Sequence, residues 1–268
     1  MIRRKSDGGC FVIAQSEHAR IAADIALNFG GAFAVPLDVE NLAGALRAHS
    51  SGFDALDARP PLSPAGRPAN IAELPLVTIL DAWARTSESA LAAGPHLGMM
   101  LSLLCLQRAA AVSAGARTLR ETFQINKLQH RQIEIQEQLR PQVGIRHDLP
   151  TRYGMPDGDT ELTDTEAQFF YGYRLMLFCL QLALELCTAR HTTCKLPSTP
   201  PAPRRDRIAV QLRTFPGRCC LSPFPLKLPL ALLISARHLS RDVYDHELEL
   251  YEALSAAPES RLPVSVEP

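Results

Sequence analysis

Two histidines, His18 and His49, are the residues of this sequence whose type and placement best suit chemistry. Each lies on the apolar face of a predicted helix, and His49 follows Leu42 and Leu46 at i, i+4 and i+7 spacing. Imidazole nitrogens are common ligands of divalent metals, so two of them could begin a metal site. The alternative is that both are hydrogen-bonded core residues, which is the commoner role of a histidine on an apolar helix face.

Two carboxylates follow the second histidine closely enough to take part in such a site. Asp54 and Asp57 precede residues 59–75, where five prolines rule out a helix or a central strand. A loop of this length often serves function. If the site is functional, we expect a divalent metal on His18 and His49 with Asp54 and Asp57 as helpers, and otherwise no cofactor.

The elements that must position these residues are predicted to be helices across residues 1–192. Ser16, Asp38 and Thr163 suit N-caps, and Pro95 suits a first helical position. The apolar spacing predicts helices over residues 16–29, ending at Gly30 and Gly31, and over 38–49, 76–93, 95–114, 117–140 and 164–189. The last of these is apolar on nearly all sides, as is typical of a central buried helix.

The pattern changes after a proline-rich segment at residues 193–206, which we interpret as a linker. Apolar residues then alternate with the two-residue period of strands at Ile208, Val210 and Leu212, at Leu232, Ile234 and Ala236, and at Leu262, Val264 and Val266. A helix is expected over 245–256. The predicted fold class is therefore mainly α: a helical domain over 1–192, and an α+β unit over 207–268 with about three short antiparallel strands and one helix packed on it.

The composition excludes several classes of function. Lys plus Arg equals Asp plus Glu at 28 each, so no net field favours nucleic acid or an anionic membrane. No run reaches the roughly 18 uninterrupted apolar residues of a spanning helix, and the seven cysteines include no C-x-x-C pair. We expect a cytoplasmic protein with no specific nucleic-acid partner and no membrane partner, while a protein partner or a second copy of the chain stays open.

Several short segments, taken in order, carry a resemblance to a known group of proteins. They are QSEHA at 15–19, HSSGF at 49–53, GRP at 66–68, LSLL at 101–104, LQLALELC at 180–187 and PFP at 223–225. Together they resemble an uncharacterised bacterial family that is itself similar to the HD-domain metal-dependent phosphohydrolases. The family pattern runs Q-x-x-H-A, H-D-x-G-W, S-x-H and D-x-L-S-L-x-L-C, and this chain keeps its two histidines as His18 and His49. The resemblance implies an HD-like helical domain.

The same resemblance implies metal ligands that this chain lacks. Ser50 stands where the family has the aspartate of its His-Asp pair, Leu104 where it has a third histidine, and Leu180 where it has a later aspartate. Hydroxyl and isobutyl groups neither fix a divalent metal nor offset its charge. The resemblance therefore predicts a non-catalytic HD-like scaffold that binds a small molecule or a protein partner.

Two other functions stay open. One is a metal-dependent phosphohydrolase with a site rebuilt around His18 and His49. The other is a structural zinc protein that uses both histidines with Cys105 and Cys179, which lie one residue from the two leucine positions. One residue on a helix is about 100° of rotation, so these thiols point away from the site if the matching is right.

Overall fold

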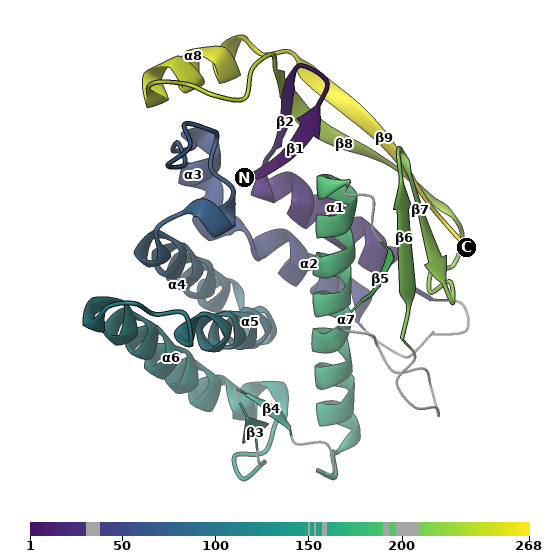
Figure 1. Cartoon of the computed structure of the whole chain (residues 1–268). Helices are drawn as coiled ribbons and strands as arrows, with labels where there is room; N and C mark the ends of the chain where they lie inside the picture. The colour runs from purple at the N-terminus through teal and green to yellow at the C-terminus, as the bar shows by residue number, and fades with distance from the viewer. Residues whose placement is uncertain (31–37, 150, 153, 157–159, 190–192, 197–208) are drawn as a thin grey trace.

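A curled sheet of seven strands lies beside a group of helices in the computed structural model (Figure 1). The structure describes the chain except for residues 31–37, 150, 153, 157–159, 190–192 and 197–208. The strands run in the order β1-β2-β8-β9-β7-β6-β5. Their bounds are Ile2–Ser6 (β1), Gly9–Ile13 (β2), Thr193–Lys195 (β5), Gln211–Phe215 (β6), Arg218–Ser222 (β7), Leu230–Leu239 (β8) and Glu259–Glu267 (β9).

This sheet overturns the predicted fold class. The prediction of a mainly α, HD-like chain with about three short antiparallel strands near its C-terminus is wrong, because the N-terminal residues add a hairpin to the same sheet. Gly8, at a φ of 79°, makes the hairpin turn, and β2 then pairs with β8 through Cys10 and Leu239. Since β7 and β9 run parallel while their neighbours run antiparallel, the sheet is mixed.

The three alternating segments do lie at or beside strands. Leu212 is in β6, Leu232 begins a buried alternation in β8, and Val264 lies in β9, whereas Ile208 is outside the described residues. Of the predicted linker, residues 193–195 form β5 and 197–206 are outside the described residues. The division at residues 1–192 and 207–268 stays a prediction about folding units, although strands from both ranges share the sheet.

Seven of the described helices follow predicted segments closely, and the short helix α3 was not predicted. The described helices are Gln15–Leu27 (α1), Val39–Ala48 (α2), Asp54–Ala58 (α3), Leu76–Ala93 (α4), Pro95–Ser113 (α5), Leu119–Leu139 (α6), Asp164–Thr188 (α7) and Glu247–Ala256 (α8). Asp38 caps α2 by accepting from the Asn41 amide, and Thr163 caps α7 in the same way. Ser16 is not a cap, because α1 begins one residue earlier, after Ala14.

Short elements complete the described fold. The 3₁₀ turns are Ser51–Phe53 (η2), Ile71–Glu73 (η3) and Arg140–Val143 (η4), and Thr151–Arg152 (β3) pairs with Met155–Pro156 (β4). The first helix was predicted to end at Gly30 and Gly31. Helix α1 ends at Leu27, and the Gly30 amide donates to the Pro225 carbonyl outside the helix, while Gly31 is not among the described residues.

Helices α1 and α7 lie between the sheet and the α4, α5 and α6 group (Figure 1). One large apolar core joins these helices to the sheet, including Ile21 of α1, Phe178 of α7 and Ile234 of β8. By length and composition alone, α5 and α7 are also apolar enough to cross a membrane, but most of each is buried in this core, and core helices pass the same test. Their apolar character is therefore accounted for by packing.

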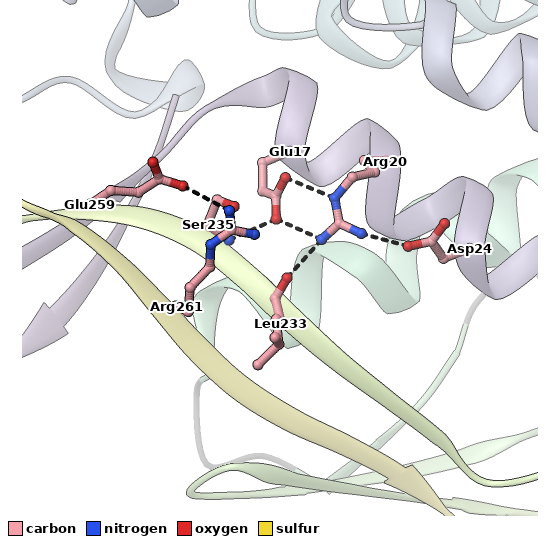
Figure 2. A network of polar contacts seen from close by, with 7 residues as sticks. All are labelled: Glu17, Arg20, Asp24, Leu233, Ser235, Glu259 and Arg261. Atoms are coloured by element: carbon pink, nitrogen blue, oxygen red, sulfur yellow. Dashed lines mark hydrogen bonds and ion pairs between the residues drawn. The ribbon is translucent and has the colours of Figure 1, made fainter.

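Polar contacts fix the other face of α1 to the sheet (Figure 2). The Arg20 guanidinium donates to both oxygens of Glu17, to Asp24, and to the Leu233 carbonyl of β8. Glu17 also accepts from the Ser235 amide at 2.7 Å. Because the carboxylates and the guanidinium of this α1–sheet network are paired, it holds α1 at a fixed position against β8.

Candidate functional site

His18 and His49 face the same pocket, which has a volume of about 590 Å³. His18 lies on α1, and His49 is the C-cap of α2, the helix that packs on α1. Both side chains are buried, and their ring centroids are 5.2 Å apart at an interplanar angle of 72°. The structure therefore brings together the two histidines that the helical spacing placed on inward faces.

The backbone fixes which nitrogen of each ring carries hydrogen. His18 Nε2 lies 3.0 Å from the Leu180 carbonyl oxygen, and His49 Nδ1 lies 2.6 Å from that of Leu46. A carbonyl only accepts, so these two nitrogens donate, and in a neutral ring the other nitrogen then holds a lone pair. His18 Nδ1 is buried with no hydrogen-bond partner in the described part of the chain. We therefore assign acceptor nitrogens to His18 Nδ1 and His49 Nε2.

Burial keeps both rings neutral. Desolvation lowers the pKa of His18 to about 4, and the positive charge of Arg108 adds to the effect. Desolvation also lowers the pKa of His49 well below its ordinary value, with further lowering by His18 and Arg108. At neutral pH the pair is uncharged, and each ring has one nitrogen available to accept a hydrogen bond or a proton.

Arg108 of α5 is a permanent charge that lines this pocket. Its guanidinium lies over the Trp83 ring, 5.9 Å from the centroid. Among the described residues, no carboxylate oxygen lies within 4.0 Å of its nitrogens, and no hydrogen bond joins it to another group. Burial lowers the Arg108 pKa, opposed mainly by Cys105 and Tyr173 rather than by an acid. The pocket therefore holds a cation that lacks a protein counterion in the part of the chain that is described.

The acids near the pocket are engaged elsewhere. Asp57 pairs with the Met1 amine at 2.8 Å and accepts from the Gln15 amide, and Glu73 pairs with Arg3. Glu185 lines the pocket and accepts from the side-chain amide of Gln181. None of these carboxylates neutralises Arg108.

The predicted carboxylate helpers do not join the histidines. Asp54 is exposed on α3, and neither it nor Asp57 is among the described residues that line this pocket. Across the described ranges, no group of three or more His, Cys, Asp and Glu side chains is placed to hold a metal ion. Among the residues it describes, the structure thus gives a metal two imidazoles and no further His, Cys, Asp or Glu ligand.

The three positions where the resemblance implies lost ligands have different surroundings. Ser50 is buried beside His49 and lines the pocket. Leu104 is buried in the main apolar core. Leu180 meets His18 through its backbone carbonyl, not its side chain.

The two candidate thiols are protonated core groups. Cys105 donates to the Trp83 carbonyl at 3.2 Å, and burial raises its pKa to about 12. Cys179 is fully buried in the apolar core, and burial raises its pKa further. Since a metal binds the thiolate, both thiols would have to lose a strongly held proton first.

Gly52 positions the turn that carries His49 and Ser50. Its amide meets Thr86 Oγ1 at 3.1 Å, and its carbonyl accepts from Arg85 at the same distance. A Cβ at this position would collide with the Ala82 carbonyl of α4, so the chain can approach α4 this closely only with glycine. The glycine in the HSSGF segment thus serves packing; it does not end α2, which stops at Ala48, and lies instead within η2.

Sequence reasoning missed Arg108 and Trp83. The signal available for Arg108 was a lone cation within the apolar helix over 95–114, where an unpaired charge is costly. Trp83, the single tryptophan, lies on the adjacent apolar helix and gave no separate signal. Both residues become recognisable only when α4 and α5 are seen to face the same pocket as α1 and α2.

Residues 1–241 match the family described as "Protein of unknown function (DUF3891)". The chain belongs to this family. No curated protein and no solved structure matches it significantly. The match confirms the uncharacterised family as the coarser part of the resemblance, and it includes the elements that line the pocket; it does not show the HD-domain relationship.

Proposed function

We propose that this protein binds a small anion in the pocket formed by His18, His49 and Arg108. The observation that carries the proposal is the guanidinium of Arg108, which faces the pocket without a carboxylate partner among the described residues. A partly buried cation without a counterion is costly to the fold. A bound anion would remove that cost and could accept two parallel hydrogen bonds from the guanidinium.

The two imidazoles would supply further polar contacts to the bound anion. A hydroxyl of the ligand could donate to His49 Nε2, the acceptor nitrogen of the second ring, since His49 Nδ1 donates to the Leu46 carbonyl. An anion without a hydroxyl would instead favour protonation of one ring, because negative charge raises the pKa of a nearby histidine. The pocket volume of about 590 Å³ falls in the range of roughly 300–1,000 Å³ that is usual for small-molecule sites.

A metal-dependent phosphohydrolase rebuilt around His18 and His49 is the second candidate, and one observation favours it. Each ring donates its other N–H to a backbone carbonyl, which is the arrangement that orients metal-binding histidines. The charge of Arg108 opposes a divalent cation at the same place, and the helpers Asp54 and Asp57 lie elsewhere. Anion binding therefore accounts for more of the site. No comparable observation favours a structural zinc site with Cys105 and Cys179.

We extend the proposal to catalysis, location and partners. A non-catalytic scaffold would bind its ligand without turnover, in keeping with Ser50, Leu104 and Leu180 at the positions described above. A cytoplasmic location, a protein partner and self-association stay predictions.

A calorimetric titration of the purified full chain tests the proposal. Inorganic phosphate, sulfate, acetate and octanoate serve as probes, with Arg108→Met as the variant and Arg120→Met as the control, since Arg120 is exposed on α6. We expect at least one anion to bind the parent and the control equally, and Arg108→Met to weaken it at least tenfold. Equal binding by all three proteins, or no binding of any probe, would overturn the proposal.

Elemental analysis of the same preparation separates the second candidate. A stoichiometric divalent metal that is lost when both histidines are replaced by glutamine would favour the hydrolase. Anion binding that is unchanged by a chelator would favour the proposal above.

A further inference from the structure

The wall of this pocket is mostly apolar, and the charged end is small. Side chains from five elements contribute: Phe53 of η2, Ile71 of η3, Ile79 and Trp83 of α4, Val112 of α5, and Leu184 of α7. The polar groups left for a ligand lie close together, because the two imidazole centroids are 5.2 Å apart and Arg108 is near enough to lower the pKa of both. The site therefore combines one anion-binding end with an extended apolar surface.

Several other polar groups around the pocket already have partners within the protein. The Asn70 side-chain oxygen accepts from the Arg3 amide at 2.7 Å, and the Arg3 guanidinium donates to the Pro68 carbonyl and to Glu73. The Thr188 hydroxyl donates to the Leu184 carbonyl at 2.9 Å. A sugar phosphate or a peptide would need several free donors and acceptors along its length. This lining offers them at the histidines and Arg108, and at Gln15 and Ser50, which are close in sequence to His18 and His49.

Leu184 is the most informative apolar residue of the wall. It is 38% exposed on α7, a helix whose other long apolar side chains are mainly buried in the core. Ile71 and Val112 also line the pocket without being fully buried. A ligand with an apolar body would cover these side chains, and each methylene removed from water contributes to affinity.

From these observations we infer that the pocket takes an organic acid with a largely apolar body, such as a medium-chain or aromatic carboxylate, in preference to an inorganic or sugar-linked anion. The acid group pairs with Arg108 beside His18 and His49, and the body lies along Trp83, Val112 and Leu184. This inference rests on the proposed function and specifies its ligand class.

Calorimetric titration with butanoate, hexanoate and octanoate tests the inference, with inorganic phosphate and 1-octanol as reference probes. Burial of one methylene corresponds to roughly a fourfold gain in affinity. We expect affinity to rise by about that factor for each methylene from butanoate to octanoate, and octanoate to bind at least tenfold more tightly than either reference probe.

Two matched variants test where the apolar body of the ligand lies in the pocket. Leu184→Gln should weaken octanoate at least fivefold and leave butanoate within twofold, because only the longer chain reaches this wall. Leu248→Gln is the control, since Leu248 is 67% exposed on α8 and is not among the residues that line this pocket. It should leave every affinity unchanged, and circular dichroism should show that both variants keep their helices.

The outcomes separate this inference from the proposed function. If phosphate binds through Arg108 as tightly as octanoate, the anion site stands and the apolar ligand class is overturned. If octanoate and 1-octanol bind equally and Arg108→Met changes neither, the apolar pocket stands and the anion site is overturned. If no probe binds, both are overturned.

Discussion

Helix α1 carries two polar faces that differ in how completely their groups are paired. On one face, Glu17, Arg20 and Asp24 form the α1–sheet network, in which each charge has a partner (Figure 2). On the other, His18 leaves Nδ1 buried without a partner in the described chain, beside an Arg108 with no carboxylate within reach. The first face is what stability alone favours, and the second has the unmet polar groups typical of binding sites.

The contrast also appears in the pKa values of the two faces. The guanidinium of Arg20 and the Ser235 amide lower the pKa of Glu17 against the opposing effect of burial, so its charged form is stabilised. For His18, burial dominates and the pKa falls, so its charged form is disfavoured.

As the pH falls, protonation of the buried His18 should be the first change to lower the unfolding free energy. An unfolded histidine takes up its proton near pH 6.5 and folded His18 only near pH 4, so the unfolded chain binds more protons between these values. The stability that depends on His18 being neutral is therefore fully present above pH 6.5. It falls by up to about 3 kcal/mol as the pH decreases toward 4. Urea unfolding at intervals from pH 7.5 to 5 measures it before most carboxylates titrate.

A matched pair of variants identifies the group responsible. His18→Asn should reduce the loss of unfolding free energy between pH 6.5 and 5, while His49, whose pKa burial also lowers, should keep part of it. His130→Gln, at an exposed position of α6, should leave it unchanged. An identical pH slope in both variants would contradict the assignment.

Removing Glu17 should lower the unfolding free energy, because it breaks the α1–sheet network. Glu17→Ala leaves the Ser235 amide without its acceptor and Arg20 without its main partner, so we expect a loss of about 2 kcal/mol in unfolding free energy at pH 7.5. Glu134→Ala is the comparison, because Glu134 pairs with Arg131 at an exposed site and should cost less than about 0.5 kcal/mol. Equal costs would show that the network does not hold α1 to the sheet.

In the absence of ligand, replacing Arg108 should raise the unfolding free energy rather than lower it. Arg108→Met removes a charge that lacks a protein partner among the described residues and keeps an unbranched chain against Trp83. We expect the unfolding free energy to rise by about 1 kcal/mol while anion affinity falls, as is common when a residue serves binding at the expense of stability. Arg20→Met should lower the unfolding free energy instead. A loss in both variants would mean that Arg108 is structural.

The helices were predictable because their signals are local. Asp38 and Thr163 cap their helices as the sequence indicates, and Pro95 begins α5. The inward positions of His18 and His49 follow from the same short-range spacing. Such signals depend only on residues a few positions apart, which a single sequence displays directly.

The sheet was only partly predictable because its pairing is long-range. Asp7-Gly8 is a hairpin signal, but the strands beside it are short, and β1 is largely polar. Nothing local shows that Cys10 will pair with Leu239. Likewise, Arg108 is recognisable as a site residue only in three dimensions, where no carboxylate of the described residues pairs with it.

The joining of the N-terminal hairpin to β8 has a consequence for the order of assembly during synthesis. Residues 1–3 form part of the pocket wall, yet the strand that secures their hairpin to the rest of the sheet is made more than 200 residues later. The helices can pack as they emerge from the ribosome, since their contacts are mostly closer in sequence. The binding site is therefore among the last parts of the molecule to be completed, and a nascent chain that stops before β8 would carry its histidines without a finished pocket.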